Sequence, residues 1–113
     1  MNIFIMTVGS RGDVQPMVAL GKGLKAAGHS VTVATSASFE PFITENGLSY
    51  GYMTDELMQL VDSDAARSAM GDSKNPIAYM KSMAQMTKDG NRINRQLMLD
   101  AWEVAKVAQP DLI

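Results

Sequence analysis

Short apolar runs alternate with helical patterns along the first half of the chain. Residues 2–7, 30–35 and 48–53 are runs rich in β-favouring side chains, and glycines stand near their ends. Such runs are typical of strands that are buried on both faces of a parallel sheet. Helices are expected between them, over residues 16–27 and 36–46. The order strand, helix, strand, helix, strand predicts an α/β fold built from right-handed βαβ units.

Proline and glycine mark the expected ends of the first helix. Met17, Leu20 and Leu24 recur at helical spacing. Pro16 stands where a proline in the first helical turn is tolerated, and Gly28 stands where a glycine commonly follows a helix. The predicted helix therefore runs from Pro16 to residue 27.

The second half of the chain predicts longer helices. Residues 62–75 are small and polar and indicate a loop or a broken helix, whereas Asn75 followed by Pro76 is a typical helix start. Two apolar stripes follow, and residues 89–91 either break the helix between them or only bend it. Pro110 ends the helical pattern, and residues 111–113 look like the beginning of a fourth strand. The 113 residues therefore resemble the front of a longer protein.

Composition narrows the classes of function. Apolar residues make up 46% of the chain and charged residues 19%, which is typical of a globular domain. The net charge of −2 and the absence of a basic block argue against a nucleic-acid partner. Without cysteine, and with His29 as the single histidine, a disulfide framework, a zinc site or a Ser-His triad is hard to build. No export signal or transmembrane segment is expected, which favours the cytoplasm and leaves peripheral contact with a membrane open.

The segment from Thr7 to Asp13 is the best candidate for chemistry. It follows the first strand and precedes the first helix, and ligands of open parallel sheets bind beyond the carboxyl ends of the strands. The segment has only two glycines, Gly9 and Gly12, and the second strand ends without an acidic residue. It also lacks the Gly-Lys-Ser/Thr sequence of a P-loop, so neither NAD nor ATP is expected to bind by these motifs.

The same residues resemble a known family. Thr7-Val-Gly-Ser-Arg-Gly-Asp-Val-Gln-Pro16, followed by Val18-Ala-Leu-Gly21 and Ala27-Gly-His29, is similar to the N-terminal signature of GT-B type glycosyltransferases. The nearest branch contains sterol glucosyltransferase-like and glycopeptide glycosyltransferases, with the glycosyltransferase family 28 N-terminal domain. The resemblance is strong over residues 1–53 and weak over residues 54–108. It implies a Rossmann-like parallel sheet, truncated at the fourth strand, and a partial acceptor-side domain over residues 1–113 whose C-terminal donor-binding domain is absent.

The resemblance also implies an activity. Such an enzyme moves a hexose from a UDP- or dTDP-sugar to a hydroxyl of an apolar acceptor, such as a sterol, a lipid or a natural product, with inversion at the anomeric carbon. Asp13 occupies the position of the catalytic base, with Ser10 beside it, and Gly9, Arg11 and Gly12 are expected to contact substrate. No metal and no cofactor are expected, because the nucleotide-sugar is a substrate. The 113 residues alone are expected to be inactive.

Simpler interpretations of these residues remain open. Asp13 equally fits a helix cap, and Arg11 fits a solvated turn or an ion pair better than a phosphate contact. His29, at the far end of the sheet, is expected to have a structural role. The ten methionines fit core filling better than the lining of a site for an apolar ligand.

The sequence also leaves two other functions and one mode of assembly open. A non-catalytic small-molecule or protein binding module is the main alternative, and a nucleotide-dependent oxidoreductase or epimerase is disfavoured by the missing glycine and acid. Because a truncated fourth strand would leave one edge of the first strand open, a dimer through that edge is also predicted.

Overall fold

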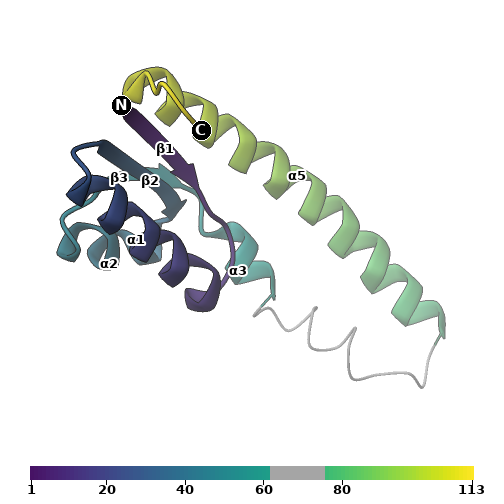
Figure 1. Ribbon diagram of the computed structural model, residues 1–113. Helices are drawn as coiled ribbons and strands as arrows, with labels where there is room; N and C mark the ends of the chain where they lie inside the picture. The colour runs from purple at the N-terminus through teal and green to yellow at the C-terminus, as the bar shows by residue number, and fades with distance from the viewer. Residues whose placement is uncertain (62–75) are drawn as a thin grey trace.

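Three parallel strands form the centre of the molecule (Figure 1). The computed structural model describes residues 1–61 and 76–113, so the loop predicted over residues 62–75 lies outside the described part. The strands are β1 (Asn2–Met6), β2 (Ser30–Ser36) and β3 (Ser49–Met53), in the spatial order β1-β2-β3. Ile3 pairs with Val31 in the first ladder, and Val33 with Tyr50 in the second. The predicted α/β class and parallel sheet are confirmed.

Helices cover both faces of this sheet. Helices α1 (Arg11–Ala26) and α2 (Glu40–Glu45), with the 3₁₀ turn η1 (Ala37–Phe39), lie on one side, and α5 (Pro76–Ala108) lies on the other (Figure 1). The short helix α3 (Glu56–Val61) follows β3 and contacts α5. Covering both faces is what strands with continuous apolar sequences require.

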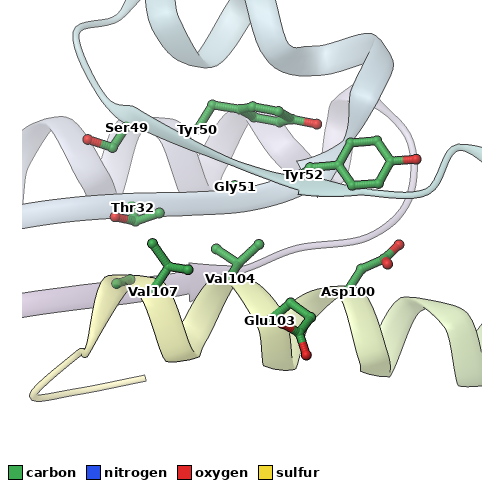
Figure 2. Close-up of a pocket in the computed structure, with 10 residues that line it drawn as sticks. Thr32, Ser49, Tyr50, Gly51, Tyr52, Asp100, Glu103, Val104 and Val107 are labelled. Carbon is green, nitrogen blue, oxygen red and sulfur yellow. The ribbon is translucent and has the colours of Figure 1, made fainter.

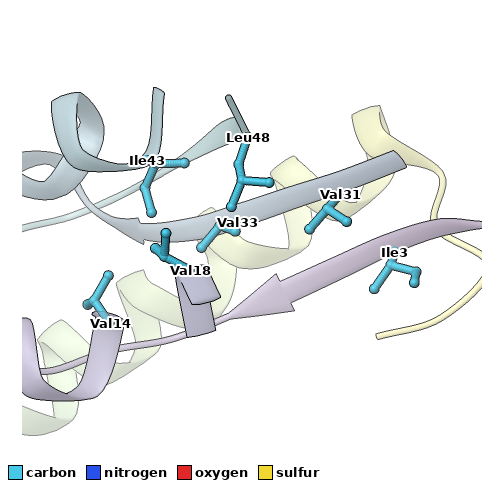
Figure 3. Packing of buried hydrophobic residues seen from close by; sticks show 7 residues of the cluster. All are labelled: Ile3, Val14, Val18, Val31, Val33, Ile43 and Leu48. Atoms are coloured by element: carbon cyan, nitrogen blue, oxygen red, sulfur yellow. The ribbon is translucent and has the colours of Figure 1, made fainter. Parts of the chain in front are cut away.

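Two separate cores result from this layering. The first lies between the sheet and the α1/α2 layer (Figure 3) and contains Ile3, Val14, Val18, Val31, Val33, Ile43 and Leu48. The second lies between the sheet and α5 and contains Phe4, Ala34, Met53, Ile93, Leu97 and Ala101. Phe4 and Ile3 are neighbours in sequence but belong to different cores, because successive side chains of a strand point to opposite faces.

Helix α1 begins five residues before the predicted start. The amides of Asp13 and Val14 both donate to the carbonyl of Ser10, so the helix begins at Arg11 with Ser10 as its N-cap. Pro16 is therefore the sixth helical residue and not the first, which corrects the prediction. Its missing N–H costs the bond that residue 16 would donate to the carbonyl of Gly12, close to the helix start. The predicted end is confirmed, since Gly28 follows the C-cap with a φ of +95°.

Helix α5 is one continuous helix of 33 residues, which runs through residues 89–91 without a break. It is about 50 Å long at 1.5 Å per residue, in a molecule whose longest dimension is 57 Å. Its second half packs on the sheet, and its first half extends past the carboxyl ends of the strands (Figure 1). The prediction that the methionines fill the core is right for Met53, which is fully buried. It is wrong for Met80, Met83 and Met98, which are exposed.

The predicted beginning of a fourth strand is found beside β1. Leu112 forms a parallel bridge with Ile3, and the amide of Phe4 donates a hydrogen bond of 2.9 Å to the carbonyl of Leu112. The amide of Asp111 donates to the carbonyl of Asn2 over 2.7 Å. The first strand thus lies between the second strand and residues 111–112, as expected. Dimerisation through the remaining edge stays a prediction.

Candidate active site

The turn after β1 places its polar groups at the carboxyl end of the sheet. Thr7 follows β1 and is still bonded to the neighbouring strand, because its amide donates to the carbonyl of Ala34 over 3.0 Å. The chain then reverses at Gly9, whose φ of +134° is rarely adopted by residues with a side chain. Ser10 follows as the N-cap of α1. The candidate segment therefore lies where the sequence predicted it, between the end of β1 and the start of α1.

The carboxylate of Asp13 folds back over this turn. One of its oxygens, Oδ2, accepts a hydrogen bond of 2.8 Å from the amide of Ser10 and one of 3.1 Å from the Ser10 hydroxyl. Asp13 is exposed, and no described residue donates a hydrogen bond to its second oxygen, Oδ1. The capping interpretation of Asp13 is thus correct for one oxygen, while the other remains available at the surface.

Gly9 is required for this arrangement. A Cβ atom built on Gly9 would lie 2.3 Å from Oδ2 of Asp13, much closer than two non-bonded atoms approach. Gly12 differs, since a Cβ atom there would meet only the hydroxyl of Ser10, at 3.7 Å. The first glycine therefore shapes the turn around the carboxylate, whereas the second has room for a side chain.

Arg11 contacts an aromatic ring that sequence reasoning did not pair with it. Its guanidinium lies over Phe42 at 5.0 Å from the ring centroid, within the range of a cation–π interaction. No carboxylate in the described residues forms the ion pair that was the simpler expectation. The Arg11 side chain is exposed, which agrees with the predicted solvated turn.

A second acidic turn lies at the same edge of the sheet, after β3. Both carboxylate oxygens of Asp55 accept hydrogen bonds from Ser38, from its amide at 3.1 and 3.3 Å and from its hydroxyl at 3.1 Å. Asp55 thus fastens the segment after β2 to the segment after β3. Sequence reasoning did not single out Asp55 as part of a site. The signal that was available is its position two residues after the end of a strand.

His29 lies at the opposite, amino end of the sheet. Its Nδ1 atom is 3.0 Å from the amino group of Met1, and its amide donates to the carbonyl of Leu24 at the end of α1. In the described part of the chain, no group of three or more His, Asp or Glu side chains is arranged to hold a metal ion.

A cleft of about 430 Å³ lies elsewhere, between β3 and α5 (Figure 2). Figure 2 shows Val104, Val107 and Asp100 directed from α5 toward the sheet. Gly51 lines its floor, and a Cβ atom there would lie 2.5 Å from Cγ1 of Val104. Asp100 is fixed, because its Oδ2 accepts from the amide of Thr54 at 3.0 Å. Asp13 does not line this cleft. The residues that line it come from the sheet and from α5, on the face of the sheet opposite α1.

Comparison with solved structures places this fold among glycosyltransferases. The calicheamicin glycosyltransferase CalG4 matches 99% of this chain with a TM-score of 0.68 at 18% identity, and the chain covers 26% of it. SsfS6, a glycosyltransferase from Streptomyces sp. SF2575, matches 99% of the chain with a TM-score of 0.61 at 22% identity, and 32% of it is covered. At these identities the likeness establishes the fold.

Sequence comparison gives closer relatives. A sterol 3-beta-glucosyltransferase of Candida albicans is 35% identical over 105 residues, which are 93% of this chain and 6% of that enzyme. The corresponding enzyme of Debaryomyces hansenii is 41% identical over 69 residues, or 61% of this chain and 4% of that enzyme. The chain thus spans about one-twentieth of the length of these relatives. Residues 3–109 match the glycosyltransferase family 28 N-terminal domain, and the chain belongs to this family.

Proposed function

We propose that this chain is the acceptor-side part of an inverting glycosyltransferase that transfers a hexose from a nucleotide-sugar to a hydroxyl of an apolar acceptor. The family match and the sterol glucosyltransferase relatives support transfer to a sterol or another lipid. A solved structure of SsfS6 contains thymidine diphosphate, which supports a UDP- or dTDP-linked donor. The donor would be bound mainly by a second domain, and the sugar would pass to the acceptor above the turn after β1.

The observation that carries this proposal is that, among the described residues, hydrogen bonds reach only one oxygen of the Asp13 carboxylate. Two donors from Ser10 fix Oδ2, and this fixes the direction of Oδ1, which is exposed. In the proposed step Oδ1 takes the proton of the acceptor hydroxyl while the hydroxyl oxygen bonds to the anomeric carbon. The bond from that carbon to the diphosphate oxygen breaks on the opposite side, and the nucleoside diphosphate leaves with its electron pair.

The remaining residues of the turn have proposed roles beside this base. Ser10 is a positioning residue, because it holds Asp13 rather than the reacting atoms. Gly12 lies in the first turn of α1, where amides have no partner within the helix, so its N–H is available to a substrate oxygen. The amide of Gly9 and the guanidinium of Arg11 are proposed to contact the transferred sugar or the acceptor.

The test is Asp13→Asn in a full-length enzyme that carries this sequence, assayed with UDP-glucose and a sterol. We expect kcat to fall by about 10²–10⁴-fold, the range for loss of a general base. Asparagine can still accept from Ser10, so the helix start should survive. Asp55→Asn is the matched control, because it alters a carboxylate at the same sheet edge that is fully occupied by Ser38. Activity of Asp13→Asn within a few-fold of wild type would reduce Asp13 to a helix cap.

A further inference from the structure

The outer edge of β3 is unpaired in the part of the chain that the structure describes. The sheet order is β1-β2-β3, and β3 pairs there only with β2. The backbone N–H and C=O groups along such an edge are a template for another extended segment. Natural edge strands are commonly protected by charged side chains or proline, and the β3 sequence Ser-Tyr-Gly-Tyr-Met contains neither. This edge is therefore open to a further strand.

The cleft between β3 and α5 follows this edge. Four consecutive residues of β3, 49–52, line it. Neighbouring side chains of a strand point to opposite faces, so a cleft that touches four residues in a row reaches the edge of the strand. Val104, Val107 and Asp100 form the opposite wall and are directed toward the sheet (Figure 2). A strand added to β3 would place every second side chain in this cleft, against α5.

The two ends of the cleft differ in polarity. Helix α5 runs antiparallel to the strands, because Asp100 accepts from the amide of Thr54 after the end of β3, whereas the carbonyl of Ala108 accepts from Asn2 at the start of β1. Val107, which is 87% exposed, therefore lies toward the amino end of β3. The cleft is apolar at this end and acidic at the other.

The cleft carries negative charge without a cation of its own. Its described lining includes the carboxylates of Asp100 and Glu103 and no lysine, arginine or histidine. Glu103 pairs with Lys106, but no cationic side chain of the described residues lies within ion-pair distance of Asp100. Both oxygens of Asp100 accept hydrogen bonds, Oδ1 from Gln96 at 2.9 Å and Oδ2 from the chain after β3, so the carboxylate is held in place. A positively charged group would complement it.

We propose that the edge of β3 and this cleft bind an extended segment of a partner protein, with an apolar residue and, two residues from it, a lysine or arginine. Hydrogen bonds to the backbone of β3 would provide affinity, and the cleft would provide specificity. Asp100 and Val104 are one helical turn apart, about 6 Å, and side chains on one face of a strand are about 6.7 Å apart. An apolar side chain against Val104 therefore brings the next side chain on that face to Asp100. The proposal does not require Asp13 to be a base, because the cleft lies on the face of the sheet opposite α1.

The test is a titration of the 113-residue chain with the fluorescein-labelled peptide Thr-Lys-Thr-Val-Thr-Lys-Thr, followed by fluorescence anisotropy. Lysine stands two residues before and two residues after the valine, so the peptide presents the proposed pattern in either strand direction. We expect saturable binding, and binding about tenfold weaker or less when glutamate replaces both lysines. Two further peptides are N-methylated at alternate residues, one at the threonines and one at the other positions. Only one of these two sets of amides can face β3, so one peptide should lose binding and the other should keep it.

Variants of the chain locate the site. Val107→Lys should weaken binding of the lysine peptide by about tenfold, because it places a cation in the cleft, whereas Leu20→Lys, at an exposed position of α1, should not. Asp100→Asn removes the charge and keeps an oxygen for the amide of Thr54. It should weaken the lysine peptide by about three- to fivefold and leave a peptide with glutamine in place of lysine unchanged, which separates charge from folding. Glu45→Gln, at an exposed position of α2, is the matched control.

Several results would overturn the proposal. These are the absence of saturable binding, equal affinity for the lysine and glutamate peptides, and full binding by both N-methylated peptides. Loss of peptide binding in a full-length enzyme would mean that another part of the same polypeptide occupies the cleft instead of a partner. Dimerisation of the chain that Val107→Lys abolishes would mean that a second copy occupies it.

Discussion

Residues 2–53 and helix α5 both carry regularly spaced apolar side chains, but these side chains have different surroundings. In the first region Val33 and Ile43 are fully buried between the sheet and its helices. Among the residues of α5 whose burial is described, the buried apolar ones are Ile93, Leu97 and Ala101, where the sheet and α3 lie against the helix. Apolar periodicity therefore identifies the face of a helix, but the length of the neighbouring element decides how much of it is covered.

The lengths explain the difference. Strands of five to seven residues extend for about 17–23 Å, whereas α5 extends for about 50 Å. At most half of the helix can therefore lie on the sheet, and its first half contacts few of the described elements. The two regions are expected to respond differently to the same substitution.

The largest expected effect comes from two neighbouring residues of α5, Leu97 and Met98. Leu97 is 4% exposed and belongs to the second core, whereas Met98 is 61% exposed. Leu97→Ala should lower the free energy of unfolding by about 2–5 kcal/mol, because it removes buried methyl groups and leaves a cavity. Met98→Ala should change it by less than about 0.5 kcal/mol. Urea unfolding followed by circular dichroism measures both changes. Similar losses of stability would mean that the Met98 side chain is buried in solution.

A smaller effect is expected where the two regions touch, at Gly51. A Cβ atom on Gly51 would lie 2.5 Å from Cγ1 of Val104 and 3.2 Å from Cβ of Ala34. Both neighbours are stiff, so Gly51→Ala should destabilise the protein by about 1–3 kcal/mol through overpacking. Gly23→Ala, at a helical position with no neighbour within 4 Å, should instead stabilise by about 0.5–1 kcal/mol.

A double variant tests the stated cause. Val104→Ala removes the atom that clashes, so it should restore part of the stability that Gly51→Ala loses. Thermal unfolding of the two single variants and of the double variant gives the coupling between the two positions. Strictly additive losses would show that α5 does not depend on Gly51 for its approach to β3.

The sequence predicted the parallel strands, the turn after β1 and the start of a fourth strand because each depends on local patterns. It did not predict that α1 begins at Arg11. Pro16 and Ser10 with Asp13 both indicate a helix start, and the prediction followed the proline. The contacts of Arg11 with Phe42 and of Asp55 with Ser38 join segments 31 and 17 residues apart. Such pairs depend on how loops meet after folding, which no single stretch of sequence contains.

The smallest effect concerns Tyr50, which lies in the packed first region. Burial, together with the negative charges of Glu40 and Asp55, raises the pKa of Tyr50 to about 12. Its hydroxyl also donates to the carbonyl of Thr35 over 3.2 Å, a bond that the ionised form cannot make. Between about pH 10 and pH 12 the folded chain therefore keeps a proton that the unfolded chain loses.

This difference makes the fold less stable as the pH rises. The stabilisation by neutral Tyr50 is complete below the unfolded pKa of about 10 and decreases toward pH 12, because the unfolded state then binds fewer protons. Partial exposure of the ring limits the loss to about 1 kcal/mol or less. Urea midpoints at pH 9 and pH 11 should differ less in Tyr50→Phe than in wild type, with Tyr52→Phe, at an exposed position of the same strand, as the control. If Tyr50→Phe loses as much stability as wild type over this range, another group causes the alkaline transition.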